Sequence, residues 1–147
     1  MKPFRFRLEK LLEFRKSHKE QSQITFLQAT SQLRVEKELS AEFETKLTET
    51  ITLLHAHQQQ SLSVEIFKSF RYYIDKISDD INKQNLLIIK AEEHRQECLC
   101  ALAEAEKNYK IVEKYREKKL QHYKEDTMKE EQKLLDEIGL QIYIRDK

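Results

Sequence analysis

Glycine and proline are almost absent from this chain of 147 residues, which contains one of each and no tryptophan. Ordinary domains use roughly 7% Gly and about 5% Pro, much of it in turns. So few turn residues exclude a many-stranded sheet and a compact bundle of many short helices. The abundant Leu, Glu, Lys and Gln favour helix over strand. The composition therefore predicts an all-α fold with very few turns.

Long apolar runs are missing as well. No stretch reaches the roughly 18 apolar residues that a membrane-spanning helix needs. The first residues lead into charged sequence rather than the apolar core of a signal peptide, so we expect no secretion. Cys98 and Cys100 are the only cysteines, and two residues apart on a helix they diverge and cannot bridge each other. Unbridged thiols favour a reducing, cytoplasmic compartment.

No motif typical of an enzyme is present. The five histidines are scattered, and beside Cys98 only His94 and Glu97 offer ligands, so a buried thiol is a better interpretation than a metal site. A Gly-rich phosphate loop and a nucleophile elbow are both missing. We therefore expect no enzymatic activity, no cofactor and no metal.

The first half of the sequence carries an interrupted heptad pattern, with Pro3 suited to the first turn of a helix. Apolar residues recur at multiples of seven and at the alternate heptad position: Leu12, Phe26, Leu33, Leu47 and Leu54, with Leu8, Ala29 and Phe43. Polar residues interrupt this seam at Arg15, Lys19, Ser22, Glu36 and Ser40. The pattern predicts a helix over about residues 4–57.

The second half carries a cleaner heptad seam. It runs in steps of four and three through Phe70, Ile74, Ile77, Ile81, Gln84, Ile88, Ala91, Arg95, Cys98, Leu102, Ala105, Tyr109 and Val112, and eleven of these thirteen are apolar. The phase then slips, because the next stripe is Leu120, Tyr123, Thr127, Glu131, Leu134 and Ile138. Such a stutter locally unwinds a coiled coil. We predict a second helix over about 69–144.

Each amphipathic helix needs a partner for its seam, and the nearest partner is the other helix. We therefore predict one domain over residues 1–147: an antiparallel coiled-coil hairpin with a hinge at about 58–68. Residue 4 would lie opposite about residue 120, and roughly the last 25 residues would overhang. The overhang carries Leu134, Leu135, Ile138 and Ile142, which suggests a docking site. A frayed terminus is the alternative.

Charge is distributed unevenly although the chain carries only +1 in total. Residues 1–19 and residues 107–124 each contain seven basic and two acidic side chains. The hairpin would place these two segments together, and we call them the basic collar. An acidic protein is favoured as its partner over nucleic acid, because Glu113 and Glu117 interleave with the lysines and no aromatic stacking platform is present. A solvated helix face is the plainer alternative.

Two motifs stand at the ends of the chain. The start reads Phe4-x-Phe6-x-Leu8-x-x-Leu11-Leu12-x-x-Arg15, and the end reads Glu113-Lys114-x-Arg116-Glu117-Lys118, then Tyr123, Glu125 and Glu131-Gln132-Lys133-x-Leu135-Asp136-Glu137-Ile138. Both resemble the FliJ family of flagellar export proteins, as do the length and the scarcity of Gly and Pro. The resemblance implies a cytoplasmic stalk at the membrane face of the flagellar type III export apparatus, and a hairpin stalk is expected to be a monomer when isolated. It also implies three partners: the ring of the export ATPase FliI, the cytoplasmic domain of the export gate FlhA, and export chaperones.

The resemblance also implies two sets of contact residues. The set for the ATPase ring is Phe4, Leu8, Leu11, Arg15, Arg116, Lys118, Tyr123, Gln132, Leu135 and Ile138. The set for the export gate is Phe70, Tyr73, Ile77, Asp80 and Gln84. This sequence departs from the family at Asp80, where a small residue is usual, and at Phe43, where the family has tyrosines. Ile77 and Gln84 also fall on the predicted seam, so a core position is their alternative.

Two other functions fit the same sequence. A passive scaffold would pair two chains in a longer coiled coil and have a dimeric mass. A nucleic-acid-binding rod would bind DNA with an affinity that falls steeply with salt.

Overall fold

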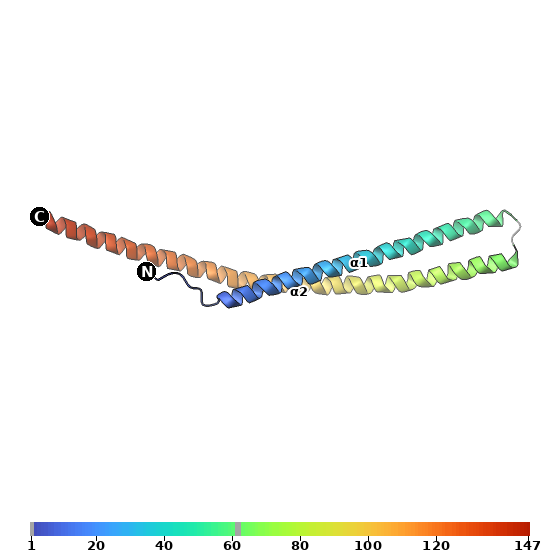
Figure 1. Cartoon of the computed structure of the whole chain (residues 1–147), viewed down its shortest axis with the longest axis horizontal. Coiled ribbons are helices and arrows are strands. Elements are labelled where there is room, and N and C mark those ends of the chain that lie inside the picture. The colour runs from blue at the N-terminus through green and yellow to red at the C-terminus, as the bar shows by residue number, and fades with distance from the viewer. Residues whose placement is uncertain (1, 61–62) are drawn as a thin grey trace. The chain divides into compact units, whose positions relative to one another are not determined.

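The computed structural model describes residues 2–60 and 63–147, and within them it contains two helices and no strand. Helix α1 spans Glu9–Gln58 and helix α2 spans Val64–Arg145 (Figure 1). The predicted all-α hairpin with a longer second helix is confirmed. In the described part of the chain, neither helix has a segment long and apolar enough to cross a membrane. The chain divides into two compact units, unit 1 (Met1–Gln21 with Ala103–Lys147) and unit 2 (Ser22–Leu102).

Unit 2 is held together by the predicted seam. Every seam position from Ser22 to Leu54 and from Phe70 to Leu102 is buried or half-buried. The most buried apolar side chains are those of Ala29, Leu33, Ile77 and Cys98. Exposed residues occupy most positions between them, as expected where two helices share one narrow apolar stripe. The heptad pattern therefore located the core of this unit correctly.

Three of the polar interruptions of the seam in unit 2, Glu36, Gln84 and Arg95, form cross-helix hydrogen bonds. Gln84 Nε2 donates a hydrogen bond to the backbone oxygen of Glu36 (2.9 Å) and another to the Glu36 carboxylate. Arg95 Nε donates to Thr30 Oγ1 (3.3 Å), and its guanidinium lies 5.3 Å from the centroid of the Phe26 ring. The pairs run in opposite directions along the two helices, so the packing is antiparallel. Polar seam residues of this kind fix one register at some cost in stability.

Unit 1 continues the seam and then ends it. Ala105 and Val112 are buried, and beyond Glu113, which is half-buried as well, the half-buried positions are Arg116, Leu120, Tyr123 and Thr127. The steps of four, four, three and four after Val112 are the stutter that the sequence predicts. Residues 128–147 are all exposed although they remain helical to Arg145. The predicted C-terminal overhang is therefore confirmed.

Two helix starts differ from the prediction. Residues 2–6 are not helical and α1 begins at Glu9, so the predicted start at residue 4 with Pro3 in the first turn is wrong. Helix α2 begins at Val64 rather than 69, because the Ser63 hydroxyl accepts a hydrogen bond from the Ile66 amide (3.4 Å) and caps the helix. Residues 61 and 62 of the predicted hinge lie outside the described residues.

Candidate protein-docking site

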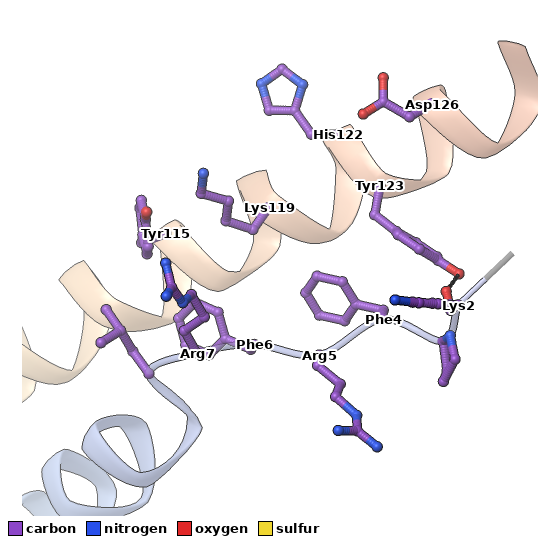
Figure 2. A pocket seen from close by; sticks show the side chains of 12 residues that line it. Lys2, Phe4, Arg5, Phe6, Arg7, Tyr115, Lys119, His122, Tyr123 and Asp126 are labelled. Atoms are coloured by element: carbon purple, nitrogen blue, oxygen red, sulfur yellow. Dashed lines mark hydrogen bonds between the residues drawn. The ribbon is translucent and has the colours of Figure 1, made fainter. Parts of the chain in front are cut away.

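The N-terminal arm (residues 2–8) precedes α1 and lies along α2 within unit 1 (Figure 2). The ring of Phe4 packs against the ring of Tyr123, with centroids 5.5 Å apart and planes tilted by 51°. Phe6 packs in the same way on Tyr115, at 5.9 Å and 53°. Tilted pairs at these distances are the favoured geometry for aromatic rings. Two aromatic pairs therefore hold the arm against the helix.

Polar contacts fix the two ends of the arm. The Tyr123 hydroxyl donates a hydrogen bond to the backbone oxygen of Lys2 (2.7 Å). Arg116 Nε donates to Glu9 Oε2 (3.1 Å), and the guanidinium lies 5.9 Å from the centroid of the Phe4 ring. The ion pair is partly exposed, so it adds little stability by itself. It does place α1 and α2 in register next to the arm.

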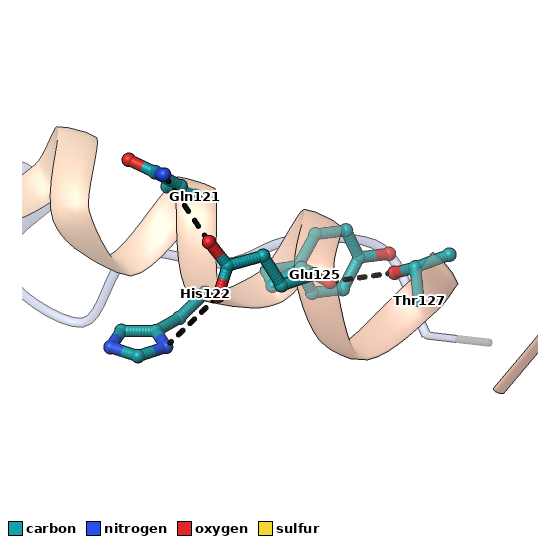
Figure 3. A network of polar contacts seen from close by, with 5 residues as sticks. Gln121, His122, Glu125 and Thr127 are labelled. Atoms are coloured by element: carbon teal, nitrogen blue, oxygen red, sulfur yellow. Dashed lines mark hydrogen bonds and ion pairs between the residues drawn. The ribbon is translucent and has the colours of Figure 1, made fainter. Parts of the chain in front are cut away.

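A second set of contacts orders α2 around Tyr123 (Figure 3). Gln121 Nε2 donates to Glu125 Oε1 (3.2 Å), and His122 Nδ1 lies 3.9 Å from Glu125 Oε2. Thr127 Oγ1 donates to the backbone oxygen of Tyr123 (2.7 Å). These contacts are local to the helix, so they support the surface that the arm covers without joining it to α1.

The arm and α2 together line an open cleft of about 1130 Å³. Its walls are aromatic and basic, and they comprise Lys2, Pro3, Phe4, Arg5, Phe6, Arg7, Leu8, Tyr115, Lys119, His122, Tyr123 and Asp126. Arg5 points away from α2 and towards solvent (Figure 2). One acidic residue among several cations gives the cleft a positive potential, which attracts acidic segments of a partner.

The basic collar is a single surface in unit 1. Lys19 Nζ lies 4.5 Å from the centroid of the Tyr109 ring, so cations of the first segment contact side chains of the second. Most of the collar's other lysines are exposed, Lys118 and Lys119 among them. Arg15 is half-buried in the seam, and no described acceptor forms a hydrogen bond with its buried Nε. An unpaired buried donor costs stability, so this part of the seam is weak.

All ten residues predicted to contact the ATPase ring lie in unit 1. Phe4, Arg116 and Tyr123 meet at the arm, as described above. Leu8, at the end of the arm, is 40% exposed, and Leu11, at the start of α1, is 36% exposed. Arg15 and Lys118 belong to the basic collar. Three more residues, Gln132, Leu135 and Ile138, lie on the overhang. Leu135 and Ile138 are exposed, and Gln132 donates a hydrogen bond to Asp136 (2.9 Å). The structure therefore gathers seven of the ten around the arm and collar and leaves three on the overhang.

The residues predicted for the export gate lie in unit 2 and do not form one exposed stripe. Ile77 and Gln84 are both only 4% exposed, in the core position that the sequence left open as their alternative. Asp80 is half-buried, and Phe70 is half-buried with its ring 5.7 Å from that of His57. Tyr73, at 46% exposure, is the most accessible of the five.

The sequence patterns did not lead us to predict the arm or the contact between Phe6 and Tyr115. The sequence does contain a pattern that indicates an extended arm. Phe4, Phe6 and Leu8 alternate with basic residues, and a period of two is typical of an extended segment rather than a helix.

Removing the hydroxyl of Tyr123 tests how the arm is held. We expect Tyr123→Phe to weaken the binding of the arm to α2 by about 1 kcal/mol of free energy, because the hydrogen bond to Lys2 is lost while the ring contact with Phe4 remains. The measurement is the rate of tryptic cleavage after Arg5 and Arg7, with Tyr143→Phe, on the exposed overhang, as the matched control. Equal cleavage rates in the two variants would contradict the role given to this hydrogen bond.

Comparison with known proteins identifies the family. The sequence model of the family described as "Flagellar FliJ protein" matches residues 4–147. Among solved structures, one described as a YscO homologue, CT670 from Chlamydia trachomatis, is similar in fold, with a TM-score of 0.65. It shares 16% sequence identity, and the match covers 96% of each chain. No curated protein matches the chain.

The family match covers both terminal motifs, the arm from Phe4 onwards and the whole overhang. The FliJ family is a non-enzymatic component of the flagellar type III export apparatus. This chain, a helical hairpin that carries the family's sequence over almost its full length, belongs to the FliJ family of flagellar export proteins.

Proposed function

We propose that this protein is the central stalk of the flagellar type III export apparatus and inserts unit 1 into the ring of the export ATPase FliI. The observation that carries the proposal is the composition of unit 1: the basic collar, the aromatic arm and an exposed apolar stripe share one unit. Apolar side chains that a free protein leaves exposed next to concentrated charge are typical of a surface that binds another protein.

The proposed mechanism follows from symmetry. A two-helix hairpin has no rotational symmetry, so inside a six-fold ring it contacts the subunits unequally. Subunits that make more contacts are biased towards one conformation, which promotes assembly of the ring. Hydrolysis elsewhere in the ring then changes which subunits hold the hairpin, and this couples the ring to the stalk.

The weak terminal seam suits this role. Arg15 has a buried, unpaired Nε, and the arm is held by two aromatic pairs, one hydrogen bond and the contact of the Arg116 guanidinium with the Phe4 ring. Contacts of that size are readily exchanged for contacts with a partner. The arm and the start of α1 would therefore contribute Phe4, Leu8 and Leu11, and the overhang would contribute Leu135 and Ile138.

We further propose that unit 2 contacts the cytoplasmic domain of the export gate FlhA and receives empty export chaperones, which places the protein peripherally at the cytoplasmic membrane face. Tyr73 supports the gate contact because it is aromatic and exposed. Phe70 and Asp80 lie within two helical turns of it and are partly accessible. Ile77 and Gln84 would take part only if the seam opened, because both are buried in the hairpin.

Stimulation of the ATPase tests the proposal. We expect the purified protein to increase hydrolysis by its cognate export ATPase, and we expect this increase to weaken from low to moderate salt because ions screen the collar. Steady-state phosphate release at several salt concentrations is the measurement. Absence of stimulation at every salt concentration, together with a dimeric mass even in dilute solution, would favour the passive scaffold instead.

A further inference from the structure

The exposed stripe on the overhang has a symmetric pattern. Its members are Glu131, Leu134, Ile138, Ile142 and Arg145, and the steps between them are three, four, four and three. Residues three and four apart lie on one face of a helix, so these five side chains form one line. All five are exposed, with Ile138 at 45% and Ile142 at 50%.

Counted outward from Ile138, the five residues have the same spacing on both sides, and the two end positions carry opposite charges. Leu134 and Ile142 are equally far from the centre, and so are Glu131 and Arg145. In an antiparallel pair of identical helices centred on Ile138, each Glu131 therefore faces an Arg145, and each Leu134 faces an Ile142. In a parallel pair, each charge would face its own copy.

We propose that this stripe is a self-association surface, on which the overhangs of two copies pair as an antiparallel two-helix coiled coil with the two-fold axis at Ile138. A two-fold interface requires a surface complementary to itself, and this stripe meets that condition. Gly139, next to the centre, has no side chain to hold the backbones apart, and nothing lies within 4 Å of where its Cβ would be.

The pair is a weak one. Each overhang contributes only residues 128–147, about 30 Å of helix, so the interface is small and the complex is transient. Glu137 flanks the centre and would approach the Glu137 of the second copy, which opposes pairing. The hairpin stays intact in each copy, unlike in the passive scaffold. A dilute solution therefore contains monomers, and pairing appears as concentration rises. Pairing and the proposed contact with the ATPase ring exclude each other, because both use Ile138.

Sedimentation equilibrium of the full-length chain over a wide range of concentrations tests the pairing. We expect a monomer–dimer equilibrium. Ile138→Asp should weaken it by roughly 100-fold or more, because two charges would be buried at the centre. Leu140→Asp is the matched control, since Leu140 is 60% exposed on the opposite face, and it should leave the equilibrium unchanged. Glu137→Gln should strengthen pairing.

Charge exchange identifies the orientation. Glu131→Arg and Arg145→Glu should each weaken homodimers by roughly tenfold, because like charges then face each other twice. An equimolar mixture of the two variants should recover the dimer, and so should the double variant alone. In a parallel pair each position faces its own copy, so the single variants and the double variant would all dimerise about as strongly as the wild type. Single variants that dimerise like the wild type would therefore overturn the proposed orientation.

A monomer at every concentration overturns the self-association and leaves the stripe to a different protein. A dimer that Ile138→Asp does not weaken overturns it as well, because the interface would then lie elsewhere. The experiment contains no ATPase, so its failure is distinct from failure of the proposed function.

Discussion

Ile77→Asp is expected to lower the free energy of unfolding by about 3–5 kcal/mol. Ile77 is 4% exposed in the seam of unit 2. The substitution removes its apolar contacts and places an ionised carboxylate between two helices, where no cation that the structure describes is paired with it. The side chain must either bury its charge or pull the helices apart. Both outcomes cost free energy, and neither has a compensating contact.

Urea unfolding followed by far-ultraviolet circular dichroism measures this loss. The matched control is Ile89→Asp on the same helix, because Ile89 is 52% exposed and its replacement leaves the seam untouched. A change of less than about 0.5 kcal/mol is typical of such surface positions. Equal urea midpoints for the two variants would show that Ile77 is not part of the core. Ile77 would then be an exposed residue available for the predicted contact with the export gate.

The seam was predictable because a coiled coil is read from spacing alone. Ala29, Leu33, Ile77 and Cys98 are buried where the heptad places them. The stutter after Val112 was also visible, since the apolar residues change phase there. Sequence periodicity reports which face of a helix is apolar, and in a two-helix hairpin that face is the whole core.

The pairing partners of the polar seam residues were not predictable. The sequence shows that Glu36, Gln84 and Arg95 interrupt a stripe, but a one-residue change in register would give each another neighbour. Only the packed structure shows that Gln84 bonds to Glu36 and that Arg95 bonds to Thr30. These bonds explain how a long, repetitive seam selects one register, because other registers would bury these groups without partners.

The arm was missed for a different reason. Pro3 followed by Leu8 and Leu11 fits a helix start as well as an extended segment, so local preference does not decide. The contacts that decide are with Tyr115 and Tyr123, more than 100 residues further along the chain. Tertiary packing overrides weak local propensity in such cases. The local structure predicted for the N-terminal side of the candidate site was therefore incorrect, because residues 2–6 form an arm rather than the start of a helix.

A triple replacement of Phe4, Leu8 and Leu11 by Ala is expected to reduce ATPase stimulation by roughly tenfold or more, because a few buried apolar anchors carry most of the energy of a protein interface. Leu8 and Leu11 are exposed in the free protein, and Phe4 precedes α1, so the hairpin should keep its helix content. Circular dichroism verifies this before the assay.

The matched control for that variant is a triple replacement of Ile24, Leu27 and Val35 by Ala. These side chains are also apolar and exposed on α1, but they lie in unit 2 and outside the predicted ring contact. The proposed stalk requires that the first variant lose stimulation and that the control keep it. Loss in both would mean that the ATPase contacts α1 along its length. If both variants kept full stimulation, the arm would not be part of the docking surface. The ATPase would then contact the basic collar and the overhang, because those are the remaining exposed features of unit 1.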